Sequence, residues 1–232
     1  EYPPLAAHSR IKLGQAQKAS GAVESAQQTW KTVLQKYGNQ PAAAAALYHL
    51  GKSQPQYWDQ LLQRFPAHPR SVEVAHKKLV ETSNPQNEKA LLLVMTRYGI
   101  YHPNVLPLVD RLVEDYGDQL TPEEWQAVGF TYWERQYYKA AGKAYSQAPP
   151  SPQTLYRAAR GLQIGEQRAA AIAGYQALNT QFPDAPETAT GLLKLAYLVD
   201  TDTAMELLDQ VVERFPQQAG EALREKADLL ES

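Results

Sequence analysis

The chain of 232 residues carries 23 Lys and Arg against 25 Asp and Glu, a formal net charge of −2, and no cysteine. This balance gives no reason to expect nucleic-acid binding, for which a basic patch is usual, and the lack of cysteine excludes disulfides, thiol catalysis and Cys-type zinc sites. The longest apolar runs, such as residues 90–95, are far too short to span a membrane.

A pattern of small and aromatic residues recurs from the N-terminal end onward. Residues 13–38 combine Leu-Gly, Ala-x-x-x-Trp-x-x-Val and Tyr-Gly, residues 47–51 open a copy with a short second helix, and residues 155–183 form a further copy. The fullest copy, residues 125–148, reads Trp-x-x-Val-Gly-x-x-Tyr and then Ala-x-x-x-Tyr-x-x-Ala. Small residues let two helices approach and large ones fill the space beside them, so this signature is typical of a tetratricopeptide helix pair.

An aromatic residue followed by Pro or Gly marks the expected helix ends, at Phe65, Tyr98, Tyr116, Phe182 and Phe215. Phe65 and Tyr98 are 33 residues apart, as are Phe182 and Phe215. A period of about 33 to 34 residues fits a two-helix repeat. Only 18 residues separate Tyr98 from Tyr116, so we expect one irregular helix pair there.

Four expected helix starts carry capping signals. Thr121 is followed by Pro-Glu-Glu, which supplies an N-cap, a proline in the first turn and a glutamate at the capping-box position. Asp184 is followed by Ala-Pro-Glu and is expected to act in the same way. Ser151 and Asn84, each directly before proline, give simpler versions of this signal.

These signals, with no convincing alternating β pattern, predict an all-α fold: a right-handed α-superhelix, or solenoid, of tetratricopeptide-like helix pairs. About six or seven pairs of roughly 34 residues would fit. We expect residues 1–232 to form a single superhelical domain, and the abrupt start and the end within a helical pattern favour a fragment of a longer chain. Such solenoids are usually binding or positioning surfaces.

The sequence offers no catalytic or metal-binding constellation. Its five histidines form no HxxxH or HxxE pair suited to a metal. Glu123 and Glu124 are adjacent carboxylates, for which helix capping is the simpler interpretation. Gly161 and Gly165 lack the strand and the lysine of a phosphate loop and are expected to end a helix. We therefore expect no catalytic residue, no metal site, no cofactor and no enzyme activity in this chain.

Aromatic residues that have no role in the packing signature are candidates for lining a groove that binds a ligand or a partner. In tetratricopeptide folds, residues one, five and eight places after the first large slot of the leading helix tend to face the concave side. This counting predicts Phe130 and Trp133 in one repeat, Tyr156 and Arg160 in the next, and Tyr48 in an earlier one. Exposed aromatics beside polar groups suit stacking on sugar rings or docking of a peptide. The alternative is packing against a neighbouring helix or a missing domain.

The remaining large residues of this region are assigned to packing or to solvent. Trp125, Tyr132 and Tyr145 occupy internal packing slots. Arg157, Arg160 and Arg168 form a small basic grouping, for which a solvated helix face is the default interpretation. The counting of concave positions also gives Gln126, Gln163 and Lys52.

Several segments carry a closer resemblance. Residues 132–135 read Tyr-Trp-Glu-Arg, residues 155–162 read Leu-Tyr-Arg-Ala-Ala-Arg-Gly-Leu, and residues 182–185 read Phe-Pro-Asp-Ala. Together with residues 55–62 and 65–70, they resemble the N-terminal superhelical region of soluble lytic transglycosylases of the Slt type, particularly the cyanobacterial form. The resemblance extends over the whole chain, and generic helical repeats share half of its motifs.

The resemblance implies a periplasmic protein that cleaves peptidoglycan glycan strands to a 1,6-anhydromuramoyl product, with its catalytic Glu in a C-terminal lysozyme-like domain. The Gly-Leu-Met-Gln motif of that domain does not occur here, and Glu24-Ser25 has no such motif after it. We therefore expect a non-catalytic domain that holds glycan strands or positions the catalytic domain. The alternative is a tetratricopeptide scaffold that binds a protein or peptide in a cell-envelope complex.

Overall fold

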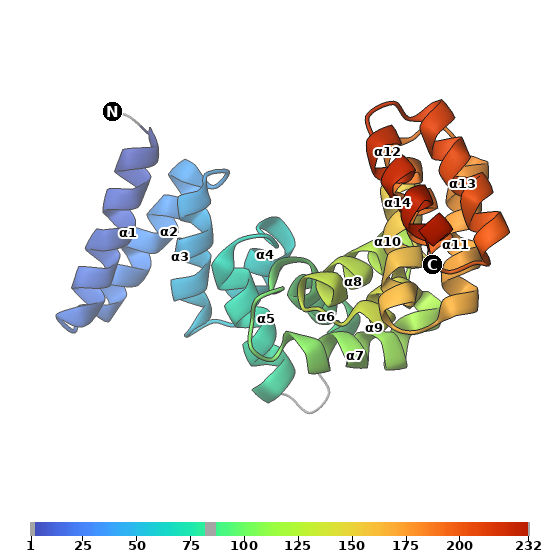
Figure 1. Ribbon diagram of the computed structural model, residues 1–232. Helices are drawn as coiled ribbons and strands as arrows, with labels where there is room; N and C mark the ends of the chain where they lie inside the picture. The colour runs from blue at the N-terminus through green and yellow to red at the C-terminus, as the bar shows by residue number, and fades with distance from the viewer. Residues whose placement is uncertain (1–2, 82–86, 232) are drawn as a thin grey trace. The chain divides into compact units, whose positions relative to one another are not determined.

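The computed structural model describes residues 3–81 and 87–231, and every regular element within these ranges is a helix (Figure 1). This confirms the predicted all-α class. The chain divides into two compact units, Glu1–Asp115 (unit 1) and Tyr116–Ser232 (unit 2), which we describe one at a time. The expected helix start at Asn84 lies outside the described residues, and the single superhelical domain remains a prediction.

In unit 1, each helix from α1 to α5 packs against its successor in the chain. Helices α1 and α2, α3 and α4, and α5 and α6 form pairs, and the first helices of successive pairs also touch, α1 against α3 and α3 against α5. Their bounds are α1 Pro3–Ala19, α2 Val23–Tyr37, α3 Pro41–Gly51, α4 Gln56–Arg64, α5 Pro69–Glu81, α6 Glu88–Tyr98 and α7 Val105–Tyr116.

Unit 2 repeats the same arrangement. From α8 to α14 each helix packs against the next, and the first helices α10 and α12 also contact each other. The order is η1 Gly117–Gln119, α8 Pro122–Glu134, α9 Tyr138–Tyr145, α10 Pro152–Ile164, α11 Arg168–Gln181, α12 Pro186–Ala196, α13 Thr201–Arg214 and α14 Ala219–Glu231. This consecutive stacking of helix pairs confirms the predicted tetratricopeptide-like solenoid.

The predicted contacts between small and large residues hold the two helices of a pair close together. In α1, a Cβ added at Gly14 would lie 2.3 Å from the indole nitrogen of Trp30 in α2. In α8, a Cβ at Gly129 would lie 2.9 Å from the ring of Tyr145 in α9. Trp30 and Tyr145 are both buried, and each ring occupies the space that a side chain on the facing glycine would fill.

The packing roles of the other assigned aromatics are mostly confirmed. Tyr132 is buried, whereas Trp125 is only half-buried and packs beside Gly117. In the short second pair, Trp58 of α4 fills the place opposite Gly51, a role that the repeat pattern had not assigned to it.

Helix ends follow the predicted markers. Helices α4, α6, α7, α11 and α13 end at or beside the five aromatic residues named above. Between Tyr98 and Tyr116 the structure has the single helix α7 where we expected an irregular pair. One helix fits in this 18-residue interval and two do not, which explains the break in the period.

Some of the capping predictions are confirmed and others are wrong. Thr121 forms the expected capping box with Glu124, and Ser151, predicted as a simpler helix start, also forms a capping box, with Thr154. The prediction for Asp184 is wrong: Ala185 is the N-cap residue and no side chain caps that helix. Gly165 follows the end of α10 as expected, but Gly161 lies inside it, against Gly142 of α9.

No helix in residues 3–81 and 87–231 has both the length and the apolar character needed to cross a bilayer.

Candidate functional site

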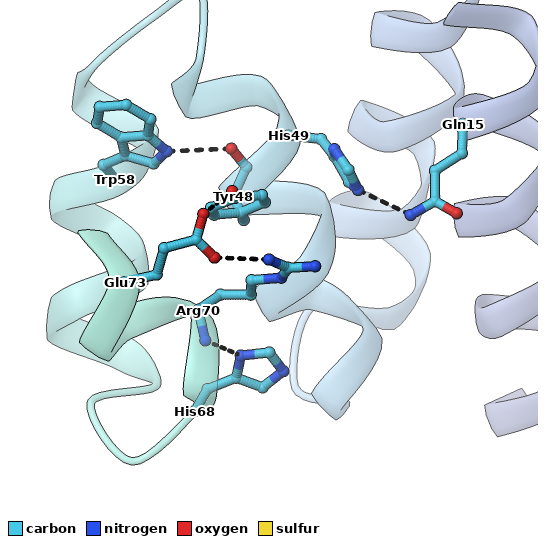
Figure 2. Close-up of polar contacts among 7 residues, drawn as sticks. All are labelled: Gln15, Tyr48, His49, Trp58, His68, Arg70 and Glu73. Atoms are coloured by element: carbon cyan, nitrogen blue, oxygen red, sulfur yellow. Dashed lines mark hydrogen bonds and ion pairs between the residues drawn. The ribbon is translucent and has the colours of Figure 1, made fainter. Parts of the chain in front are cut away.

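The first helices of three successive pairs in unit 1 bring a group of polar side chains together (Figure 2). Helix α1 supplies Gln15, α3 supplies Tyr48 and His49, and α5 supplies Arg70 and Glu73. Five alanines in a row, residues 42–46, make α3 slender, so its neighbours on both sides can approach it closely.

Tyr48 is the centre of this group. Its side chain is only 6% exposed, and its hydroxyl donates a hydrogen bond to the Glu73 carboxylate. The Arg70 guanidinium donates to the other oxygen of Glu73 at 2.5 Å and lies 4.5 Å from the Tyr48 ring centroid. The Lys52 ammonium lies 4.7 Å from the same centroid. Two cations therefore stand over the predicted groove residue, and a ligand would meet them before the ring.

The carboxylate of this group is held ionised. Burial raises the pKa of Glu73, but the hydrogen bonds from Tyr48 and Arg70 and the charge of Arg70 outweigh it and lower the pKa below its ordinary value. Burial and the adjacent carboxylate together raise the pKa of Tyr48. The tyrosine thus stays a hydrogen-bond donor and the glutamate an acceptor at neutral pH.

His49 links α3 to α1 and α2. Its ring stacks on Trp30, with centroids 4.7 Å apart and planes 13° from parallel, and its Nε2 lies 3.0 Å from the Gln15 amide nitrogen. Burial lowers the pKa of His49 to about 4, and the nearby charges of Lys52 and Arg70 add to this effect. His49 is therefore neutral at physiological pH, which suits an aromatic stacking role.

A groove of about 390 Å³ opens beside this group, between α1 and α3. This volume falls within the range of small-ligand and side-chain pockets, roughly 300 to 1,000 Å³. Most of its accessible surface is apolar, and its lining includes His8, Ile11, Lys12, Gln15, Ala42, Ala45 and His68.

In unit 2, the predicted residues Phe130 and Trp133 of α8 meet around an arginine. The Arg157 guanidinium of α10 lies 5.7 Å from each of their ring centroids and donates to the Tyr145 hydroxyl at 2.8 Å. Trp133 also meets the rings of Tyr138 and Tyr145 edge-on. The expectation that Arg157 lies on a solvated helix face is wrong, because it is half-buried among aromatic rings.

The other predicted pair, Tyr156 and Arg160, lies one turn apart on α10. Arg160 donates to the Gln163 side-chain oxygen at 2.8 Å, and the hydroxyl of Tyr175 donates to the same oxygen at 2.8 Å. The rings of Tyr156 and Tyr175 are 6.3 Å apart, and burial raises the pKa of both tyrosines. Both predicted side chains are half-buried, and Phe130, 37% exposed, is the most accessible of the aromatic ones.

The predicted surface thus falls into a Tyr48 group in unit 1 and a Phe130, Trp133, Tyr156 and Arg160 group in unit 2. Sequence reasoning missed Arg70 and Glu73, because concave positions were counted in the segments of α3, α8 and α10 and not in that of α5. The sequence did carry one signal that these helices differ from the rest of the chain, because the segments that form α1 and α3 contain no Asp or Glu. Among the described residues, no three His, Asp or Glu side chains are grouped to hold a metal ion.

No protein-family model matches this sequence, and no curated protein matches it. Among solved structures, the chain is similar to one in the crystal structure of the APC/C hetero-tetramer Cut9-Hcn1, with a TM-score of 0.40 and 11% sequence identity. The match covers 94% of this chain and 42% of that one, so this chain spans less than half the length of its structural neighbour. A likeness at this level carries no argument about function.

Proposed function

We propose that this chain is a helical-repeat scaffold that binds a protein or peptide segment along the first helices of its pairs, without itself catalysing a reaction. The groove between α1 and α3 is the observation that supports this most directly. It is open and mostly apolar, and its lining comes from α1, from the start of α3 and from His68, which lies just before α5. Figure 2 shows two of these residues, Gln15 and His68. Polar groups converging on a concave apolar surface are typical of peptide-binding sites.

Site-specific photo-cross-linking tests this proposal. A benzophenone amino acid replaces Lys12, which lines the groove, or Lys36, an exposed residue of α2 that does not line it, and each protein is irradiated in an extract of the source organism. We expect a discrete cross-linked protein from position 12 that excess unlabelled chain suppresses, and none from position 36. Identical patterns from the two positions would contradict the proposal.

The second candidate is the non-catalytic superhelical region of a periplasmic lytic transglycosylase. It is supported by the resemblance of residues 132–135 and 155–162 and by the accessible ring of Phe130 next to Arg157, an arrangement that suits stacking on a sugar. In this role the chain holds glycan strands or positions a catalytic domain.

Retention on purified sacculi tests the second candidate. We expect wild-type protein to be retained and Phe130→Ala to lose retention severalfold, whereas Tyr137→Ala, which removes another exposed ring of unit 2, keeps it. Equal retention of the two variants would rule out the Phe130 surface, and no retention of wild type would rule out the glycan-holding role.

A further inference from the structure

The charges on the face that α1, α3 and α5 form in unit 1 are mostly positive. Helices α1 and α3 contain no acidic residue, although the whole chain has a formal net charge of −2. Lys12 lies in the groove, Lys18 is close enough to lower the pKa of His49, and Lys52 stands over Tyr48. This face is therefore a local basic surface on a chain that is slightly acidic overall.

The acidic groups of α5 offset only part of this positive charge, and Lys52 is the lysine that interacts electrostatically with Glu73. Glu73 is engaged by the Tyr48 hydroxyl and by Arg70, and Glu81 pairs with Lys77 at the end of the helix. In contrast, Lys12, Lys18 and Lys52 form no ion pair with any residue that the structure describes. All three are exposed, so they remain available to carboxylates from outside the chain.

The groove adds an apolar contact beside Lys12, which is the one of these three lysines that lines it. Its floor consists of small or aliphatic groups, Ile11, Pro41, Ala42 and Ala45, and its rim carries Lys12, Gln15 and His68. A small apolar side chain fits such a floor, and amide groups on the rim can bond to a peptide backbone. A nucleic-acid backbone would use the lysines but would leave this floor uncovered.

We propose that this groove, together with the lysines near the ends of α1 and α3, binds an acidic, extended segment of a protein partner that carries carboxylates as well as a small apolar side chain. The inference rests on the proposed scaffold function and specifies the partner's chemistry. Each exposed ion pair contributes only about 0.2 to 1 kcal/mol, so the apolar contact is needed for affinity while the lysines select the partner. Binding weakens with salt because exposed charges are screened within about 10 Å at 0.1 M.

Panning a random twelve-residue peptide library on the full chain tests this inference. We expect the bound peptides to be enriched in Asp and Glu, and their affinity to fall about tenfold for Lys12→Glu combined with Lys52→Glu. The control combines Lys36→Glu with Lys143→Glu, two exposed lysines of α2 and α9 that do not belong to the α1–α3–α5 face, so that it changes the net charge equally. It should bind as wild type does. Circular dichroism confirms that both double variants are folded.

Each other outcome overturns the inference in an identifiable way. Enriched peptides without acidic residues, or equal losses in the two double variants, reject the acidic partner but leave the scaffold function standing. The same holds if no peptide is enriched while position 12 still cross-links to a protein. A single-stranded oligonucleotide that displaces the peptides at lower concentration would identify nucleic acid as the better partner. Failure of both panning and cross-linking rejects the inference and the scaffold function together.

Discussion

At the residue scale, glycine positions carry the tightest constraints. A Cβ on Gly142 of α9 would lie 2.6 Å from the backbone nitrogen of Leu162 and 2.9 Å from the carbonyl oxygen of Ala158, both in α10. Main-chain atoms in a helix cannot rotate away as the end of a side chain can. The crossing of α9 and α10 therefore requires glycine at this position, and Gly161 faces it from the other helix.

We predict that Gly142→Ala lowers the free energy of unfolding by about 2 kcal/mol, because the two helices must move apart. The matched control is Gly220→Ala in α14, where an added Cβ meets nothing within 4 Å. There the better helix propensity of alanine should leave stability unchanged or slightly higher. Urea denaturation followed by circular dichroism measures both, and equal midpoints for the two variants would contradict the packing argument.

His49 provides a second prediction at this scale. Its pKa in the folded chain is about 4, below the ordinary value of 6.5, so the unfolded chain takes up this proton at a higher pH than the folded one. The stability that the neutral His49 ring gives to the folded chain is therefore complete above pH 6.5, and it is lost as the pH falls towards 4. Since the ring is only half-buried, we expect a loss of about 1 to 2 kcal/mol.

Chemical denaturation of wild type and His49→Gln at pH 7 and pH 4.5 measures this effect. The pKa values of His68 and His102 are lowered as well, so both proteins lose stability in acid. The difference between them isolates His49: the wild type should lose more. The same acid loss in both proteins would show that His49 does not titrate as described.

At the scale of the single element, helix starts that look alike in sequence differ in structure. Thr121 accepts a hydrogen bond from the Glu124 backbone at 3.3 Å, and the Glu124 carboxylate accepts one from the Thr121 backbone at 3.0 Å. Asp184 lies one residue too early to cap α12, which starts at Pro186 after the N-cap residue Ala185. The Thr188 hydroxyl instead donates to the carbonyl of Phe182 at 2.6 Å and fixes the preceding turn.

We predict that Thr121→Ala lowers the free energy of unfolding by about 1 kcal/mol, the usual effect of losing an N-cap side chain. Asp184→Ala removes a similar signal from the sequence but no capping hydrogen bond, so its effect should stay within about 0.5 kcal/mol. Thermal unfolding of both variants distinguishes them. A loss for Asp184→Ala as large as that for Thr121→Ala would indicate a capping interaction at α12.

The elements also show how far sequence reasoning reaches. The pattern of small and aromatic residues predicts the pairing of α1 with α2 and of α8 with α9. It can do so because each small or aromatic residue of the pattern makes a contact between two helices that follow each other in the chain. The same rules do not locate the Tyr48, Arg70 and Glu73 group. These residues meet through the contact of α3 with α5, and that contact depends on the spacing of successive pairs, which no single repeat encodes.

At the scale of the whole molecule, stability should follow the division into two units. In repeat proteins, stability is roughly the sum of the repeats and of their nearest-neighbour interfaces, so a continuous set of stacked pairs can fold without the rest. Unit 2 has such a set in α8 to α14 and its own buried core, which includes Tyr175, Leu192, Leu208 and Val211.

We therefore predict that residues 116–232 alone are helical and unfold cooperatively in urea. Gly142→Ala should lower the midpoint in this fragment as it does in the full chain, since the α9–α10 crossing lies wholly within unit 2. Circular dichroism at 222 nm follows both transitions. A gradual, non-cooperative loss of signal would show that the stacked pairs of unit 2 are insufficient for folding. A cooperative transition insensitive to Gly142→Ala would place the limiting interface elsewhere in the unit.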